Sequence, residues 1–293
     1  MTEVSTDKRR GGPTSVWMSL LAETSLHPGS GRELGVVDLP VAREGGTGHP
    51  VLFGSQLKGS LRDRAEQLGW DKNRKADLDR VFGSPDAAGF VLFSDARVVL
   101  LPVRSLTSAY RWVTCPHVLE RLARDFDRTR GATSFDVPQI AGLDKALSNQ
   151  PQPGKRLFLE EREVEVAGGV PEDVLEAVEG LFGASAARKR VGQQLTIVSD
   201  DTFSWFARYG LPVRARNALD KDKQSKSLWY EESLPPDTLL VAVVSSRGAG
   251  APGADLADLF RDARYLQVGG NETVGEGWVA VHWPSAAAGK EGD

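Results

Sequence analysis

The sequence is poor in cysteine and histidine and contains no long apolar run. Of its 293 residues, one is cysteine (Cys115) and four are histidine. A single cysteine excludes an internal disulfide framework and a zinc site made of several cysteines. No apolar run approaches the roughly 20 residues needed to span a bilayer, and the polar opening MTEVSTDKRRGGPTS lacks the apolar stretch of a secretory signal. We therefore expect a cytoplasmic protein with no membrane partner.

Signatures of common catalytic and nucleotide sites are also missing. The histidines follow no metal-ligand spacing, and neither a Gly-x-Ser-x-Gly elbow nor a His-Glu-x-x-His pair occurs. The glycine-rich loop of residues 268–279 has P-loop spacing at Gly270 and Gly275. Glu276 and Gly277, however, stand where a P-loop needs its lysine and hydroxyl. We expect these glycines to let the backbone approach another group closely.

Charge is distributed unevenly along the chain. The net charge of −4 argues against a general nucleic-acid binder. Residues 97–130, however, carry seven arginines against three acids, and residues 208–226 carry six basic residues against two acids. Residues 160–179 carry eight acids and one arginine. This segregation permits a basic groove on an acidic protein, although charge runs more often form a solvated face.

Apolar spacing predicts alternating strands and helices. Residues 16–27 resemble an opening strand, followed by a long irregular segment up to Pro50. Leu57, Leu61, Ala65 and Leu68 recur at helical spacing, with Ser55 as the expected N-cap. Further elements are expected at 89–103 (two strands around Ser94 and Asp95), 115–130 (helix), 171–183 (helix), 194–206 (strand, turn and helix), 238–246 (strand) and 277–283 (strand). The sum predicts an α+β fold with a mainly antiparallel sheet.

The chain is longer than one ordinary domain, so it holds either two domains or one domain with insertions. We expect one domain over residues 14–286, with loose termini at 1–13 and 287–293. Residues 136–169 contain the turn-rich SNQPQPGKR and the alternating LFLEEREVEVAG. This pattern predicts a two-stranded arm inserted into the domain.

Asp38 is the first candidate functional residue. It ends the stretch HPGSGRELGVVDLP, where Val36 and Val37 favour extended backbone. Local sequence leaves two interpretations open, a carboxylate that stabilises a turn and a carboxylate that performs chemistry.

Two further groups are candidates for contact with nucleic acid. Lys58 and Arg62 lie one turn apart on the expected helix beside Gly59, where a phosphate would meet free amides and a positive helix end. A solvated helix face is the alternative. Glu231 and Glu232 follow two aromatic residues, a pattern compatible with base stacking or with the lining of an active site, but a half-buried strand end explains them better.

Four motifs in one order resemble a single family. They are HPGSGRELGVVDLP (27–40), REGGTGHPVLFGSQLKGSLRD (43–63), LWYEESLPPDTLL (228–240) and LQVGGNETVGEGWV (266–279). Together they are similar to the backbone subunit of the type III-B CRISPR effector, the Cmr complex, within the repeat-associated mysterious protein (RAMP) superfamily. The resemblance spans residues 16–283. In the 142–168 segment only the general character of the sequence is similar, and no motif matches.

The resemblance implies a ferredoxin-like, RRM-like palm with an inserted hairpin thumb, for which the 136–169 arm is the candidate. It also implies a subunit that polymerises along guide RNA beside other effector subunits. Each copy would hold complementary single-stranded target RNA and make one cut in it, and the thumbs would interrupt the guide–target duplex at regular intervals.

The resemblance also assigns site residues. Asp38 becomes the cutting carboxylate, which would hold a divalent ion such as magnesium or manganese or assist proton removal, while His27 and Glu232 are additional candidates at the same site. The RNA-contacting candidates are Ser55, Lys58, Arg62, Gly269, Gly270 and Asn271. Two other interpretations stay open, a non-cleaving RNA scaffold of the same fold and, more distantly, a small-molecule enzyme with a defined pocket.

Overall fold

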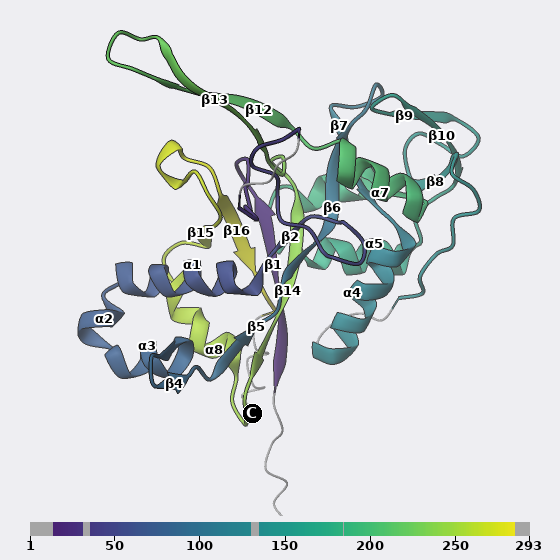
Figure 1. Ribbon diagram of the computed structural model, residues 1–293. Coiled ribbons are helices and arrows are strands. Elements are labelled where there is room, and N and C mark those ends of the chain that lie inside the picture. The colour runs from purple at the N-terminus through teal and green to yellow at the C-terminus, as the bar shows by residue number, and fades with distance from the viewer. Residues whose placement is uncertain (1–13, 32–35, 130–134, 184, 285–293) are drawn as a thin grey trace, which may run out of the picture.

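The computed structural model describes residues 14–31, 36–129, 135–183 and 185–284 (Figure 1). The termini expected to be loose, 1–13 and 287–293, lie outside the described residues. The described chain forms a mixed α+β fold around a large, mainly antiparallel sheet, as the sequence predicted. Among the described helices, none is long and apolar enough to cross a bilayer.

The centre of the sheet is built from the most apolar strands. Strand β1 (Ser15–Ala22) pairs antiparallel with β14 (Leu239–Ser246) on one side and β16 (Trp278–His282) on the other. Strand β14 also pairs with β5 (Val91–Phe93) and β6 (Ala96–Arg104). Every residue of β14 is buried, which explains its continuous run of apolar side chains.

The remaining strands extend the sheet on both sides. They are β2 (Val51–Leu52), β7 (Tyr110–Thr114), β8 (Lys145–Ser148), β9 (Arg156–Leu159), β10 (Arg162–Gly168), β11 (Leu195–Val198) and β15 (Tyr265–Gln267). The strand order is β15-β16-β1-β14-β6-β7-β11-β8-β10-β9. The pairs β11–β7 and β10–β8 are parallel, whereas the other pairs in this order are antiparallel. Strands β3 (Gly83–Ser84) and β4 (Ala87–Ala88) form a small separate pair.

Helices cover both faces of the central strands. Helix α1 (Gly54–Gln67) and α8 (Pro252–Ala257) lie on one side, and α4 (Pro116–Thr129) lies on the other (Figure 1). The other helices are α2 (Trp70–Asn73), α3 (Lys75–Phe82), α5 (Glu172–Gly180), α6 (Arg188–Gln194) and α7 (Asp200–Tyr209), with 3-10 turns at Asp258–Phe260 and Glu272–Val274.

The start and end of α1 differ from the sequence prediction. Its N-cap is Phe53, not Ser55, because the Gln56 side chain accepts the Phe53 N–H at 3.0 Å and Asp95 accepts the Gly54 N–H at 2.8 Å. Leu68 lies beyond the last turn and is 41% exposed, so it does not belong to the buried face of the helix. Apolar spacing identified the helix, but tertiary contacts decide where it begins.

Two hairpins of the structure are candidates for the inserted arm that the sequence predicted. The 136–169 segment contains the antiparallel pair β9–β10, but this pair forms the edge of the main sheet and buries residues such as Leu157 and Val164. A different hairpin, β12 (Val213–Leu219) with β13 (Ser225–Glu232), forms its own two-stranded sheet. Figure 1 shows it projecting away from the sheet. The freely projecting arm is therefore β12–β13.

Candidate functional site

Asp38 lies in the long connection between β1 and β2. The Tyr230 N–H donates to its Oδ2 at 2.8 Å, and the Leu39 N–H donates to the Tyr230 carbonyl at 3.1 Å. Oδ1 makes no hydrogen bond within the described part of the chain. Asp38 is exposed, so its carboxylate is anchored through one oxygen and accessible through the other.

The backbone around Asp38 is not the strand that its valines suggested. Val36 is 95% exposed and lies in a bend. Leu39 alone forms an isolated parallel bridge, to Glu231 at the end of β13. β-branched residues favour extended backbone only where neighbours can pack against them, and Val36 has no such burial.

Glu232 holds the chain that follows Asp38. Its Oε1 accepts from the Arg43 guanidinium at 2.7 Å, and its Oε2 accepts from the Val41 N–H at 3.0 Å. The residue is 6% exposed. Both carboxylate oxygens are thus occupied inside the protein, and removal of either partner would leave an uncompensated buried charge and destabilise the loop.

His27 is buried beside the same strand end. Its Nδ1 lies 2.7 Å from the Glu232 carbonyl oxygen, which can only accept, so Nδ1 carries the hydrogen. The glycine loop packs directly on this residue, because the Gly270 N–H donates to the His27 carbonyl at 2.9 Å. Gly269 has a φ of +83°, and a Cβ there would lie 2.6 Å from the same carbonyl. The predicted close approach of this loop is therefore made to the His27 backbone.

Asn271 turns inward in this structure. Its backbone adopts a φ of 63°, and its Nδ2 donates to the carboxylates of Glu231 and Glu276, the latter at 3.0 Å. Both acids are buried. The amide group is thus already used by two protein acceptors.

The three candidates on α1 differ from one another. Ser55 is exposed in the first turn. Lys58 is half-buried, and its ammonium has no partner among the described residues. Arg62 already donates to Glu66 and to the Gly83 carbonyl, at 2.9 Å in each case. Lys58 is therefore the cation of α1 that is most available to a ligand.

Helix α1 borders the other candidates across a cleft. Gln56 donates to the Gly29 carbonyl at 3.0 Å, which ties the start of α1 to the segment carrying His27. The cleft has a volume of about 190 Å³ and is lined by Gly59, Ser60, Asp63, Gln267, Gly269 and Glu272. The structure therefore gathers Asp38, His27, Glu232 and the glycine loop around residues 230–232, with α1 alongside.

Sequence reasoning missed two contributors to this arrangement. Arg43 donates to Glu232, to the Gly48 carbonyl at 2.9 Å and to the Ala207 carbonyl at 2.7 Å, so it connects three segments. No local pattern distinguishes Arg43 from an exposed arginine. The β12–β13 hairpin did leave a signal, since VRARNAL alternates and is followed by the turn-forming Asp220, whose Oδ1 accepts from the Asp222 and Gln224 N–H groups.

The carboxylates around Asp38 determine whether it could share a metal ion with them. No group of three or more histidine, cysteine, aspartate or glutamate side chains is arranged to hold a metal within the described ranges. The carboxylates of Glu231 and Glu232 are engaged by Asn271 and Arg43. Magnesium commonly takes one or two carboxylates and completes its shell with waters and substrate phosphates. Asp38 fits as one ligand of such a shared site.

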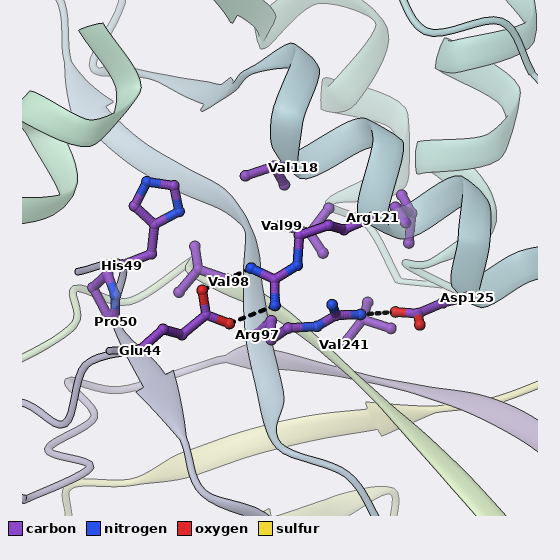
Figure 2. Close-up of a pocket in the computed structure, with 11 residues that line it drawn as sticks. Glu44, His49, Pro50, Arg97, Val98, Val99, Val118, Arg121, Asp125 and Val241 are labelled. Atoms are coloured by element: carbon purple, nitrogen blue, oxygen red, sulfur yellow. Dashed lines mark hydrogen bonds and ion pairs between the residues drawn. The ribbon is translucent and has the colours of Figure 1, made fainter. Parts of the chain in front are cut away.

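A separate cavity lies where the loop after Asp38 meets β6 and α4 (Figure 2). It contains two arginine–carboxylate pairs, Arg121 with Glu44 at 2.6 Å and Arg97 with Asp125. Its volume of about 20 Å³ has room for little more than one water. These arginines of the 97–130 run are thus neutralised internally, and they do not form the basic groove that the sequence permitted.

Burial and neighbouring charges also shift the pKa values of two side chains that line this cavity, Glu44 and His49. Burial would raise the pKa of Glu44, but hydrogen bonds from Arg121 and Thr47 outweigh it and hold the pKa below its usual value. Burial lowers the pKa of His49 to about 4, against a smaller opposing effect of Glu44. Glu44 therefore stays ionised to a lower pH than an ordinary glutamate, and His49 stays neutral down to about pH 4.

Comparison with known proteins gives a consistent set of relatives. The RAMP superfamily profile matches residues 19–280. The CRISPR system Cmr endoribonuclease Cmr4 of Pyrococcus furiosus is 35% identical over 282 residues, covering 90% of this chain and 94% of that protein.

Solved structures extend the comparison to the fold. A crystal structure of oligomeric Cmr4 from Pyrococcus furiosus has a TM-score of 0.71 at 28% identity, covering 92% of this chain and 97% of that chain. A cryo-EM structure of the type III-B Cmr-beta complex bound to cognate target RNA contains a chain with a TM-score of 0.73 at 23% identity, covering 92% of this chain and 96% of that chain. At this lower identity the likeness concerns the fold.

Proposed function

The chain belongs to the RAMP superfamily, and we propose that it is the repeated backbone subunit of a type III-B CRISPR effector, which binds guide RNA and cleaves complementary target RNA. The similarity to a Cmr endoribonuclease over 90% of the chain supports this activity. The observation that carries it is the exposed carboxylate of Asp38, held by the Tyr230 N–H at the foot of the projecting hairpin.

The reaction assigned to Asp38 is attack of a target 2′-hydroxyl on the adjacent phosphate. A bond forms between the 2′-oxygen and phosphorus, the bond from phosphorus to the 5′-oxygen breaks, the 2′-proton is removed, and the departing 5′-oxygen gains a proton from water to leave as a hydroxyl. The accessible Oδ1 of Asp38 can accept that proton or help to orient the hydroxyl. The Tyr230 N–H keeps the carboxylate in place while this happens.

A divalent ion such as magnesium or manganese is part of the proposal. Asp38 would supply one oxygen ligand, and RNA phosphates and water would supply the others. Such an ion would neutralise the charge that develops on the phosphate.

His27 and Glu232 act in this proposal as positioning residues. The occupied carboxylate oxygens of Glu232 hold Val41 and Arg43, and thereby the chain that follows Asp38. His27 joins the strand end to the glycine loop through its ring and its carbonyl. Neither needs to touch the reacting atoms.

Two parts of the fold would contact RNA. Lys58 and the cleft between α1 and the glycine loop are the proposed guide contact. Gly269 lines the cleft, Gly270 follows it in the loop, and Ser55 and Arg62 lie elsewhere on α1. The β12–β13 hairpin is a better candidate for the thumb than the 136–169 arm, because it projects and its tip carries Lys221, Lys223 and Lys226. The ferredoxin-like, RRM-like palm would be the sheet and helices from which it projects.

The proposed partners are guide RNA, single-stranded target RNA, further copies of this chain and other effector subunits. The Pyrococcus furiosus Cmr4 structure is of an oligomer, and the Cmr-beta structure contains target RNA. A cytoplasmic location is consistent with this set of partners and stays a prediction.

The test is the variant Asp38→Asn in assembled complexes. The amide keeps the shape and can still accept from Tyr230, but it removes the negative charge. We expect assembly and target binding to be retained and cutting to be lost, measured by gel mapping of end-labelled target under single-turnover conditions. Asp86→Asn, which changes an exposed aspartate of the β3–β4 turn, is the matched control.

Full cutting by Asp38→Asn would make Asp38 a turn residue. Absence of cutting in wild-type complexes supplied with divalent ions would favour the second candidate, a non-cleaving RNA scaffold of the same fold. A small-molecule enzyme is disfavoured, because the cavity of about 20 Å³ and the cleft of about 190 Å³ are both smaller than the roughly 300–1,000 Å³ of ordinary ligand pockets.

A further inference from the structure

The projecting hairpin depends on its foot for its direction. Residues along its outer part, including Asn217, Leu219 and Leu228, are exposed, and Figure 1 shows this part pointing away from the sheet. A two-stranded hairpin is only marginally stable by itself. Its orientation must therefore be set by the contacts that β12 and β13 make where they leave the body.

Several of those contacts are ionic, and they stand beside the backbone hydrogen bonds that Leu39 makes with Tyr230 and Glu232. Arg214 pairs in register with Glu231, so both side chains point to the same face of the hairpin. On this face Arg216 Nη2 lies 2.5 Å and Arg214 Nη1 lies 3.3 Å from Glu276 Oε1. The second nitrogen of the Arg214 fork donates to Ser25 Oγ at 2.9 Å.

The acceptors of this cluster belong to both the hairpin and the glycine loop. Asn271 Nδ2 donates to Glu231 of β13 and to Glu276 of the loop. Glu231 is 4% exposed and Glu276 is 8% exposed. Arg216 Nε lies 3.7 Å from Glu231 Oε2, an ion pair without a hydrogen bond. Two buried carboxylates thus share two guanidinium groups and one amide.

Such a cluster restrains direction more strictly than apolar packing does. Each buried carboxylate loses its water and keeps its stability only while its partners stay in place. Arginine donates through a planar fork, so a swing of the hairpin would break several contacts together. The cluster therefore favours one orientation of the hairpin over its neighbours.

The same glycine loop packs on His27, and the strand that contributes Glu231 also holds Asp38 through Tyr230. We propose that Glu276 and Arg216 are positioning residues, which lock the hairpin to the glycine loop and thereby set where Asp38 meets the target RNA. The lock itself follows from the contacts, while its effect on cutting rests on the proposed function.

The lock can be tested without measuring cutting. Cys115 is buried, so spin labels placed on Lys223→Cys at the hairpin tip and Glu120→Cys on α4 report one distance in the full chain. We expect a narrow distance distribution that is lost in Glu276→Gln. Asp258→Asn is the control, because it weakens exposed ion pairs with Arg74 and Arg261, which belong to neither the hairpin nor the glycine loop. This variant should keep the narrow distribution. An equally narrow distribution in Glu276→Gln would overturn the proposal.

Arg216→Lys provides a second variant if Glu276→Gln does not fold. It keeps the charge but lacks the fork, so the distribution should again broaden. A narrow distribution in this variant would count against the lock in the same way.

The consequence for chemistry is measured in assembled complexes. With Glu276→Gln we expect a lower kcat, unchanged target affinity and additional cuts next to the normal positions. Merely weakened folding would lower the active fraction without shifting cut positions. A broadened distribution with unchanged cutting would overturn the link to Asp38. If wild-type complexes did not cut at all, the proposed function would fail, whereas the distance measurement would still decide the lock.

Discussion

At the scale of single residues, identical chemical groups acquire different roles from their surroundings. Asp38 contacts the end of β13, and Glu232 is the last residue of that strand. Asp38 keeps one carboxylate oxygen accessible, while both carboxylate oxygens of Glu232 are bound. A general base or metal ligand needs an oxygen that substrate can reach. This difference is why the proposed function assigns the chemistry to Asp38 and a positioning role to Glu232.

Lys58 offers a test of the guide contact. Its ammonium has no partner among the described residues and should bind one phosphate. Lys58→Ala should therefore weaken guide-RNA binding and reduce the slope of log affinity against log salt by about 1. Filter binding across a range of salt concentrations measures both quantities. Lys72→Ala on α2 removes another lysine and should change neither. An unchanged affinity and slope for Lys58→Ala would remove Lys58 from the guide contact.

At the scale of elements, we expect different results from shortening the β12–β13 hairpin and from shortening the 136–169 arm. Residues 217–228 can be replaced by Asn-Gly, a favoured two-residue turn, while the paired Arg216 and Trp229 are kept. We expect the body to remain folded and the regular spacing of cuts to be lost, because the projecting part would no longer separate successive target segments. Gel mapping of the target shows the spacing, and circular dichroism shows the fold.

The matching change in the 136–169 arm is removal of residues 151–154, which the sequence placed at its tip and the structure places in the connection between β8 and β9. The β9–β10 hairpin that follows is an edge of the main sheet, so shortening this connection should leave the cut positions unchanged. The reverse outcome, with spacing altered here and preserved in the trimmed β12–β13 hairpin, would restore the 136–169 arm as the thumb.

Elements with a regular apolar pattern could be predicted from the sequence, and those without one could not. The two strands around Ser94 and Asp95 and the helix α4 appear where spacing placed them, because their buried faces impose a period on the side chains. The alternation in β12 is present, but its exposed charges look equally like a solvated run. Propensity therefore could not distinguish an arm from a loop there.

The candidate site was predictable only in part. Asp38, His27 and the glycine loop were identified by resemblance, and the structure brings them to one strand end. The burial of Glu276 was not foreseeable, since a charged residue in a glycine-rich loop is ordinarily exposed. Its two arginine partners come from β12 and can be found only when the chain is folded.

At the scale of the whole molecule, buried histidine makes stability depend on pH. The pKa of His49 falls from its usual value of 6.5 to about 4 in the folded chain, and burial also lowers the pKa of His282. Unfolding therefore takes up protons between about pH 6.5 and 4, so stability is full above this window and decreases as the pH falls through it. His49 is 5% exposed. At roughly 1.4 kcal/mol per pKa unit, its pH-dependent contribution to the free energy of unfolding is at most about 3 kcal/mol.

Urea unfolding of the isolated chain at pH 7 and pH 5 measures this dependence. His49→Gln, which retains a donor for Ser204, should lose part of the difference between the two pH values. An identical difference in wild type and variant would show that His49 does not contribute.

A repeated subunit that carries its own site makes a further prediction. Complexes assembled from mixed wild-type and Asp38→Asn chains should lose individual cuts in proportion to the mutant fraction, while the cut positions stay constant. Quantified bands of end-labelled target measure this. Collective loss of all cuts at a low mutant fraction would contradict independent sites.

The anchoring of Asp38 by a backbone amide has one more consequence. Because the donor is the N–H of Tyr230 and not its ring, the side chain at position 230 is free to change without releasing the carboxylate. Of the common residues, only proline lacks that donor. Any substitution of Tyr230 other than proline therefore changes the side chain at the foot of the hairpin while the main chain still anchors the Asp38 carboxylate.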